Sequence, residues 1–266
     1  MDIRAIFLDI DGTLVSFNTH RIPESAVSAL AEARKKGIKV FIATGRPTII
    51  IDNIGQLQSA GLIDGYITMN GAYCYRGDRT VSSTAIPPHC VSSVWKWCVD
   101  HGRTCIAIRE HDLCISRDSD QLQEIFYKQL KCTTPMPELK PGQDINSRPI
   151  FQLTAFFTPD EEQSSELASA LNGCSTGRWH NSFTDITAAG CTKSTGIDAF
   201  ATAFGFSLGQ TMAFGDGGND IPMLKHAGTG IAMGGASDIV KAASDYITDD
   251  VDNDGIRNAL VHFGII

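Results

Sequence analysis

The chain has 266 residues and a formal net charge of −8, with 22 Lys and Arg against 30 Asp and Glu. This balance argues against non-specific nucleic-acid binding, which needs clustered cations. The 42% of hydrophobic residues suffice for a packed core and argue against a disordered chain. We expect one large domain or two smaller ones. We expect no membrane association, because no apolar run is long enough to span a bilayer and acidic residues soon interrupt the N-terminal run.

The eight cysteines show no zinc-type spacing, since no two of them form a Cys-x-x-Cys pair. A chain of this length does not need disulfides to hold its core together. We therefore expect free thiols and a reducing, cytoplasmic location.

Short apolar runs and a helical pattern alternate at the start of the chain. Ala5–Leu8 and Val40–Ala43 are unbroken by polar residues, which is typical of strands buried on both faces of a parallel sheet. Between them, Glu24–Lys36 has helical periodicity, with Pro23 at its start and Gly37 just after its end. This β–α–β unit predicts an α/β fold, with a Rossmann-like, mostly parallel sheet and helices on both faces.

Residues 84–186 differ in character from their surroundings, because they contain six of the eight cysteines and all three tryptophans. Their patterns predict an α+β region with partly antiparallel strands, including a helix over 160–171. The loop 133–149 contains no evident element. We interpret 84–186 as a second domain inserted into a core formed by 1–83 and 187–266.

Polar residues follow several apolar runs at the carboxyl ends of the predicted strands. They are Asp9 with Asp11, Thr44 to Arg46, Asn70 with Gly71, and Gly215 to Asp220. Ligands of open α/β sheets bind beyond the carboxyl ends of the strands. We therefore expect a functional site at this edge of the sheet.

The first candidate constellation is Asp9-Ile10-Asp11-Gly12-Thr13-Leu14 at the end of the first strand. A turn at Gly12 can bring both carboxylates to one small volume. Carboxylates so close repel each other, so a hard cation such as Mg²⁺ is expected nearby. Taken alone, this constellation is as typical of a turn or a helix cap as of a functional site, since Asp-Gly is a common turn pair.

Three further constellations contain groups suited to phosphate chemistry. Gly215-Asp216-Gly217-Gly218-Asn219-Asp220 combines acids with glycines that let backbone amides approach a ligand, and it lacks the spacing of a calcium loop. Thr44 with Gly45 and Arg46 offers a hydroxyl and amides to a phosphoryl oxygen. Lys193, taken by itself, is typical of a solvated surface lysine.

In this order, the four constellations resemble the four motifs of the haloacid dehalogenase-like (HAD) hydrolase superfamily. Asn70-Gly71-Ala72 and Asn219-Asp220-Ile221-Pro222-Met223-Leu224 resemble its Cof-type, sugar-phosphatase-like branch. The stretch from Asp11 to Thr44 is too short to hold a cap, whereas the stretch from Thr44 to Lys193 far exceeds a parallel crossover. The insertion therefore lies between the second and third motifs, which resembles a C2B-type cap.

The resemblance implies an enzyme, a phosphoric monoester hydrolase that cleaves small phosphomonoesters, sugar (hexose) phosphates in particular, through an aspartyl-phosphate. Asp9 would be the nucleophile, and Asp11 would protonate the leaving alcohol and later activate water. Asp9, the backbone carbonyl of Asp11 and Asp216 would hold Mg²⁺. Asp220 and Asn219 would orient that shell or reach the phosphate.

The remaining candidates would bind the phosphoryl group. Thr44, the Gly45 amide and Lys193 would hold its oxygens in the transition state. Arg46 would either contact the substrate or pair with acids of the core. Asn70 would line the phosphate pocket, form the turn at Asn70-Gly71, or do both.

The cap would close over the site and select the substrate, a small phosphorylated metabolite. Its polar candidates are each more typical of surface groups; they are Arg109, His111, Arg148, Arg178, His180 and Asn181. A phosphomutase of the phosphomannomutase kind, which shares this core and cap class, is the alternative function. The intact motifs argue against a non-enzymatic module, and we expect a monomer.

Overall fold

The computed structural model describes residues 2–130 and 132–266, apart from the side chain of Trp179. The chain divides into two compact units. The first consists of the residues up to Arg46 together with Ile51–Ser82 and Thr192–Ile266, and the second consists of Pro47–Ile50 and Ser83–Cys191. The second unit thus includes residues 47–50, 83 and 187–191, which lie outside the predicted insertion.

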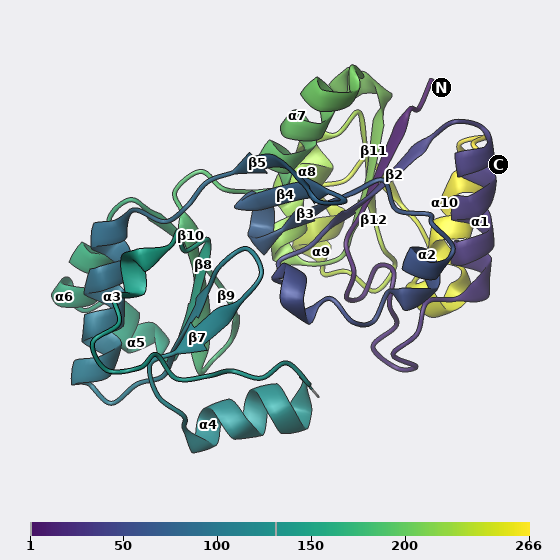
Figure 1. Cartoon of the computed structure of the whole chain (residues 1–266). Helices are drawn as coiled ribbons and strands as arrows, with labels where there is room; N and C mark the ends of the chain where they lie inside the picture. Colours follow the sequence, from purple (N-terminus) through teal and green to yellow (C-terminus); the bar gives the residue numbers. More distant parts are fainter. Residues whose placement is uncertain (1, 131) are drawn as a thin grey trace. The chain divides into compact units, whose positions relative to one another are not determined.

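The first unit is built on a sheet that has eight strands among the described residues (Figure 1). In spatial order the strands are β13 (Tyr246–Ile247), β12 (Thr229–Ala232), β11 (Thr211–Gly215), β1 (Ala5–Leu8), β2 (Lys39–Ala43), β3 (Gly65–Thr68), β4 (Tyr73–Arg76) and β5 (Arg79–Ser83). Strands β13 to β3 pair in parallel, and β4 is antiparallel to β3. The prediction of a mostly parallel α/β sheet is confirmed.

Helices cover both faces of this sheet. Helices α1 (Glu24–Lys35) and α10 (Gly255–His262) pack on one face, with α2 (Gly55–Ser59) beside them. Helices α7 (Lys193–Phe204), α8 (Ile221–His226) and α9 (Asp238–Lys241) pack on the other.

Strand β1 shows why its sequence contains no polar residue. Ile6 and Leu8 point into one core cluster, while Ala5 and Phe7 point into the other. Phe7 stacks on Phe41 of β2 with ring centroids 4.8 Å apart. Since each fully buried side chain of this size stabilises the fold by about 1.5–3 kcal/mol, the central strands anchor the loops at their carboxyl ends.

The second unit is built on an antiparallel sheet that has five strands among the described residues. In spatial order they are β7 (Leu113–Ile115), β6 (Cys105–Ile108), β8 (Gln152–Ala155), β10 (Phe183–Ala188) and β9 (Cys174–His180). Helices α3 (Pro88–Asp100) and α6 (Ser165–Ala170) pack against one face of the sheet. Helix α4 (Asp120–Leu122) continues as a π-helix over Gln123–Gln129. The predicted α+β character is therefore observed.

The prediction of one helix over 160–171 is wrong, because the segment forms two helices. Helix α5 (Pro159–Glu162) begins at a capping box of Thr158 and Glu161. Ser164 then accepts a hydrogen bond from the Leu167 backbone N–H and begins α6. A second N-cap inside a helical pattern ends the first helix and starts the next.

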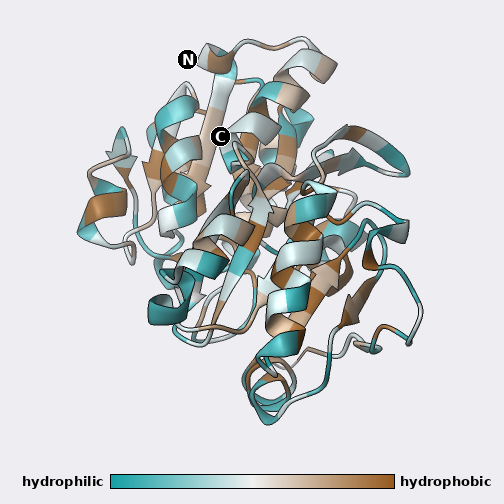
Figure 2. Ribbon diagram, turned by 90° about the vertical axis from the view of Figure 1, so that its left-hand side faces the viewer, coloured by the Kyte–Doolittle hydropathy of each residue, from teal (hydrophilic) through white to brown (hydrophobic). Residues whose placement is uncertain are grey.

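Figure 2, coloured by hydropathy, shows hydrophilic and hydrophobic residues along the same helices, as expected for helices with one buried face. All eight cysteines are described, and each is a free thiol. None of the helices formed by the described residues is long and apolar enough to cross a membrane.

Candidate active site

The loop after β1 brings the first and fourth motifs into contact. The Asp9 backbone N–H donates to the Phe214 carbonyl, 3.1 Å away, which ties the end of β1 to β11. Gly12 then adopts a left-handed φ of +82°, and a Cβ placed on it would lie 2.2 Å from Asp216 Oδ2. Only glycine allows this turn and this close approach of Asp216.

Lys193 lies at the centre of the site, although its sequence context is typical of a surface lysine. Its Nζ is 2.5 Å from Asp9 Oδ1 and 2.5 Å from Asp220 Oδ1, and its side chain is fully buried. Lys193 is the first residue of α7, and Thr192 caps that helix by accepting from the Thr195 backbone N–H. A buried lysine requires such partners, because an uncompensated charge in the core is costly.

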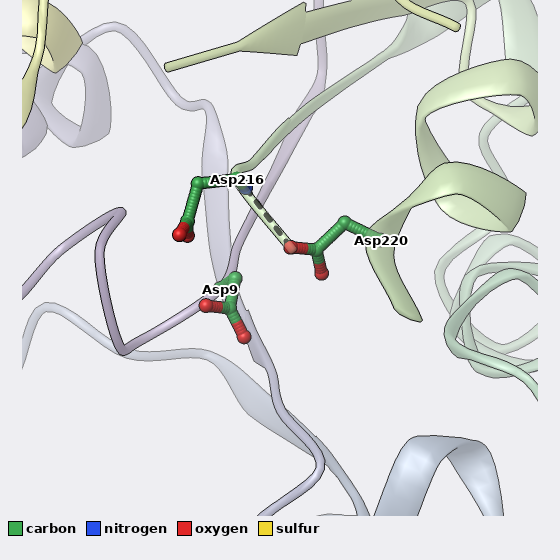
Figure 3. A group of neighbouring side chains, drawn as sticks. All are labelled: Asp9, Asp216 and Asp220. Atoms are coloured by element: carbon green, nitrogen blue, oxygen red, sulfur yellow. Dashed lines mark hydrogen bonds between the residues drawn. The ribbon is translucent and has the colours of Figure 1, made fainter. Parts of the chain in front are cut away.

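Asp220 orients the loop after β11. Its Oδ2 accepts a hydrogen bond from the Asp216 backbone N–H at 3.0 Å (Figure 3). The same oxygen accepts from the Gly217 backbone N–H at 2.8 Å. Since its Oδ1 accepts from Lys193, both oxygens of Asp220 are already engaged. Asp220 is therefore suited to hold the loop and Lys193 in place rather than to take a further ligand.

Thr13 belongs to the first motif, but no role is expected for it from the sequence. Its fully buried hydroxyl donates to Asp216 Oδ1 at 2.8 Å. The hydrogen bond fixes the orientation of a carboxylate that comes from a distant part of the chain. The spacing of Thr13 from Asp11 is a sequence signal, but its partner becomes evident only in the fold.

Asp9, Asp216 and Asp220 form an acidic cluster in which one oxygen of each lies within 4.8 Å of the others (Figure 3). Among the described residues, no donor is found for Asp9 Oδ2 or Asp216 Oδ2. These two oxygens can therefore accept a cation, and carboxylate oxygens suit a hard one. The Asp11 side chain does not belong to this cluster.

Burial and mutual repulsion shift the pKa values of these groups. Burial raises the pKa of Asp9 well above its usual range; Lys193 opposes the shift, while Asp220 and Asp216 add to it. Burial also raises the pKa of Asp216 to about 6, against the opposing hydrogen bond from Thr13. Although burial by itself lowers the pKa of Lys193, Asp220 and Asp9 raise it above its usual range. The site thus has more negative charge than one lysine balances.

Arg46 and Asp11 form a bidentate ion pair at the same edge of the sheet. Arg46 Nε donates to Asp11 Oδ2 at 2.7 Å, and Nη2 donates to Oδ1 at 2.8 Å. Arg46 Nη1 also lies 3.7 Å from Asp52. Of the two interpretations of Arg46, the structure displays the pairing with acids.

Thr44, Gly45, Asn70 and Asn219 also come together. The buried Thr44 hydroxyl accepts from the Arg46 backbone N–H at 3.0 Å. Asn70 has a left-handed φ of 51°, and its Oδ1 accepts from Asn219 Nδ2 at 3.1 Å. A Cβ on Gly45 would lie 3.3 Å from the Asn70 amide. Asn70 therefore forms the predicted turn and also directs its side chain towards the other candidates.

The polar candidates of the second unit are mostly engaged within that unit. Arg178 donates to Glu162 at 2.8 Å and to the Phe157 carbonyl at 2.9 Å. Arg109 and Arg148 both pair with Asp112, at 2.9 and 2.6 Å. Arg109 is also buried, which differs from the surface position expected for it.

The first unit has the architecture of a phosphoryl-transfer hydrolase: a mostly parallel sheet with a buried lysine, converging carboxylates and glycine-rich loops at one edge. A family model described as haloacid dehalogenase-like hydrolase matches residues 6–260, and the chain belongs to this family.

Similar proteins support this assignment over the whole chain. The structure of the HAD subclass IIB sugar phosphatase BT4131 is 48% identical, with a TM-score of 0.90 and coverage of 99% of this chain and 100% of that one. Pyridoxal phosphate phosphatase YbhA of Escherichia coli (strain K12) is 30% identical over 269 residues, covering 96% of this chain and 97% of its own. YkrA of Bacillus subtilis (strain 168), provisionally named a phosphatase, is 31% identical over 268 residues and covers both chains fully.

The chain is therefore an enzyme, a phosphatase of the HAD family. Its resemblance to the Cof-type branch is confirmed.

Proposed function

We propose that the enzyme is a Mg²⁺-dependent phosphatase that hydrolyses sugar phosphates, hexose phosphates in particular, through an aspartyl-phosphate. The observation that carries this proposal is the environment of Asp9. One of its oxygens is held by the buried Lys193, and no donor occupies the other among the described residues. The similarity to BT4131, described as a sugar phosphatase, supports the substrate class.

One carboxylate oxygen of Asp9 attacks phosphorus, and the bond from phosphorus to the ester oxygen breaks as the new bond forms. Asp11 gives a proton to the leaving alcohol, then takes one from the water that hydrolyses the aspartyl-phosphate. Because both Asp11 oxygens accept from Arg46, Arg46 must release one of them when Asp11 carries the proton.

The residues present fit a magnesium ion. Asp9 and Asp216 supply the two carboxylate oxygens without donors, and the backbone carbonyl of Asp11 would complete the protein ligands. Thr13 and Asp220 orient these ligands, because the Thr13 hydroxyl donates to Asp216 Oδ1 and Asp220 accepts from the Asp216 backbone N–H. When bound, Mg²⁺ neutralises the excess negative charge and so lets a phosphate dianion approach.

Lys193, the Gly45 amide and the Thr44 hydroxyl hold the phosphoryl oxygens. Since Thr44 Oγ1 accepts from the Arg46 amide, its own proton remains available to the phosphate. Asn70 and Asn219 border this position. Such fixed donors stabilise the charge that develops in the transition state.

The second unit selects the substrate as a cap, and the substrates are small phosphorylated metabolites of the cytoplasm. The insertion leaves the sheet and its loops intact, so selectivity can vary without changing the chemistry.

The test is phosphate release from a panel of hexose phosphates, with Mg²⁺ or with EDTA, in the absence of any bisphosphate activator. We expect Mg²⁺-dependent release, and we expect Asp9→Asn to reduce kcat by about 10³-fold or more because the variant lacks the nucleophile. Asp238→Asn, a change at an exposed helix position, is the matched control and should retain full activity.

Two outcomes would contradict the proposal. Substantial Mg²⁺-dependent hydrolysis by Asp9→Asn would exclude Asp9 as the nucleophile. Isomerisation of a hexose phosphate with little phosphate release would instead identify a phosphomutase.

A further inference from the structure

Phe17 is an exposed aromatic side chain beside the acidic cluster. It is 66% exposed, whereas large apolar side chains are usually buried. A Cβ placed on Gly12 would lie 2.7 Å from Phe17 Cε2 and 2.2 Å from Asp216 Oδ2. The ring edge and Asp216 Oδ2 therefore approach the same point beside Gly12, so the ring lies at the border of the acidic cluster.

The loop that carries Phe17 is fixed by hydrogen bonds. The buried Ser16 accepts from the backbone N–H groups of Asn18 and Thr19 at 3.0 and 3.1 Å. Ser16 also donates through its own N–H to the Arg21 carbonyl, and Asn18 Nδ2 donates to Asp252 at 2.7 Å. These bonds hold the backbone on both sides of Phe17, so the position from which the ring projects is fixed by the local structure.

We propose that Phe17 is a specificity residue whose ring contacts the carbon skeleton of the substrate's leaving group. An exposed aromatic ring gains from an apolar partner, and the C–H face of a sugar ring or an aromatic alcohol provides one. The phosphoryl group of the substrate is bound separately, by Lys193 and the Gly45 backbone amide. This inference rests on the proposed phosphatase function and adds the requirement of a leaving group with an apolar face.

The experiment compares two substrates in the wild-type enzyme and in Phe17→Ala. For glucose 6-phosphate, which has a large leaving group, we expect kcat/KM to fall by about tenfold, mainly through KM, because the lost contact is one of uniform binding. For acetyl phosphate, whose leaving group is small, we expect a change of no more than about twofold. Phe17→Tyr, which keeps the ring, should restore the glucose 6-phosphate value.

Ile239→Ala is the matched control, since Ile239 is 70% exposed and lies on α9. It should leave both substrates unchanged. The Mg²⁺ concentration for half-maximal activity should also be the same in Phe17→Ala and in the wild type, which separates loss of substrate contact from damage to the acidic cluster. Equal losses for both substrates, or no loss for either, would overturn the proposal.

If hexose phosphates are not substrates, the outcome can be distinguished from the absence of a role for Phe17. If the wild-type enzyme cleaves acetyl phosphate but no hexose phosphate, p-nitrophenyl phosphate replaces glucose 6-phosphate, since its leaving group is an aromatic ring. A loss of about tenfold on that substrate in Phe17→Ala would still support the role of Phe17. An unchanged value would refute it.

Discussion

The charged cluster around Lys193 in the first unit differs from Arg178 in the second unit in whether all of its hydrogen-bonding atoms have partners. In the first unit, Lys193, Asp9 and Asp216 converge at the edge of the sheet, and two carboxylate oxygens have no donor among the described residues. In the second unit, Arg178 has its donors occupied by Glu162 and by backbone carbonyls. Both regions contain buried or half-buried charge, but Arg178 uses its donors within its own unit, whereas Asp9 and Asp216 each keep an oxygen for a ligand among the described residues.

This difference distinguishes charged groups that can bind a ligand, such as Asp9 and Asp216, from charged groups that stabilise the fold, such as Arg178. A buried charge whose partners are all internal contributes to packing and to hydrogen bonding. A cluster with excess charge of one sign is stable only with a proton or a cation. Removing a charge from each unit should therefore have different consequences.

The largest effect is expected for Lys193→Met, which keeps the size of the side chain but not its charge. The rate should fall by about 10²-fold or more, because a charge that stabilises the transition state is lost. In EDTA the free energy of unfolding should fall by about 3 kcal/mol or more, since Asp9 and Asp220 lose their buried partner. Urea unfolding and initial rates measure the two effects, with the exposed Lys225→Met as control. A normal rate would remove Lys193 from the mechanism.

Arg178→Ala should affect stability but hardly affect chemistry. The variant leaves backbone carbonyls of the second unit without a donor and Glu162 without its partner, so we expect a loss of about 2 kcal/mol in the free energy of unfolding. Turnover of acetyl phosphate should stay within about twofold of the wild type. If turnover of this small substrate falls as it does in Lys193→Met, the contrast between the two units is wrong.

Thr13→Val should weaken the metal site without removing a ligand. The variant is close in size and lacks the hydroxyl that orients Asp216. Loss of such an orienting contact typically reduces metal affinity by about tenfold or more. The Mg²⁺ dependence of the initial rate measures this, and the rate at saturating Mg²⁺ should largely recover. An unchanged Mg²⁺ dependence would show that Thr13 serves the fold alone.

The smallest effect is expected for the pH dependence of stability. Because the pKa of Asp216 is about 6 in the folded state against 3.8 for an ordinary aspartate, the folded state binds more protons between these values. In EDTA, this group therefore lowers stability as the pH rises through that window. Mg²⁺ should raise Tm more at about pH 7.5 than at about pH 5, where protons compete with the metal. An equal rise at both pH values would contradict a carboxylate site.

Several parts of the fold were predictable because their signals are local. The apolar run Ala5–Leu8 and the helix that ends before Gly37 follow from composition and periodicity. Strands β4 and β5 were not predicted, although the Gly77-Asp78 turn between two short alternating runs is a hairpin signal. The division of 160–171 into two helices depends on the side chain of Ser164, which caps α6. Apolar periodicity alone does not reveal the effect of one capping residue.

The sequence by itself determined which residue types are available and in what order. Acids and glycines follow buried strands, and the carboxyl ends of parallel strands meet at one edge, so Asp9 and Asp216 could be placed near each other in advance. Only the tertiary structure decided the contacts. Lys193 is fully buried between Asp9 and Asp220. Thr13 donates to Asp216, and Arg46 forms an ion pair with Asp11. These pairs are separated by long stretches of chain. Their distances and burial follow from the packing of α7 and the loops on the sheet, which local sequence patterns do not encode.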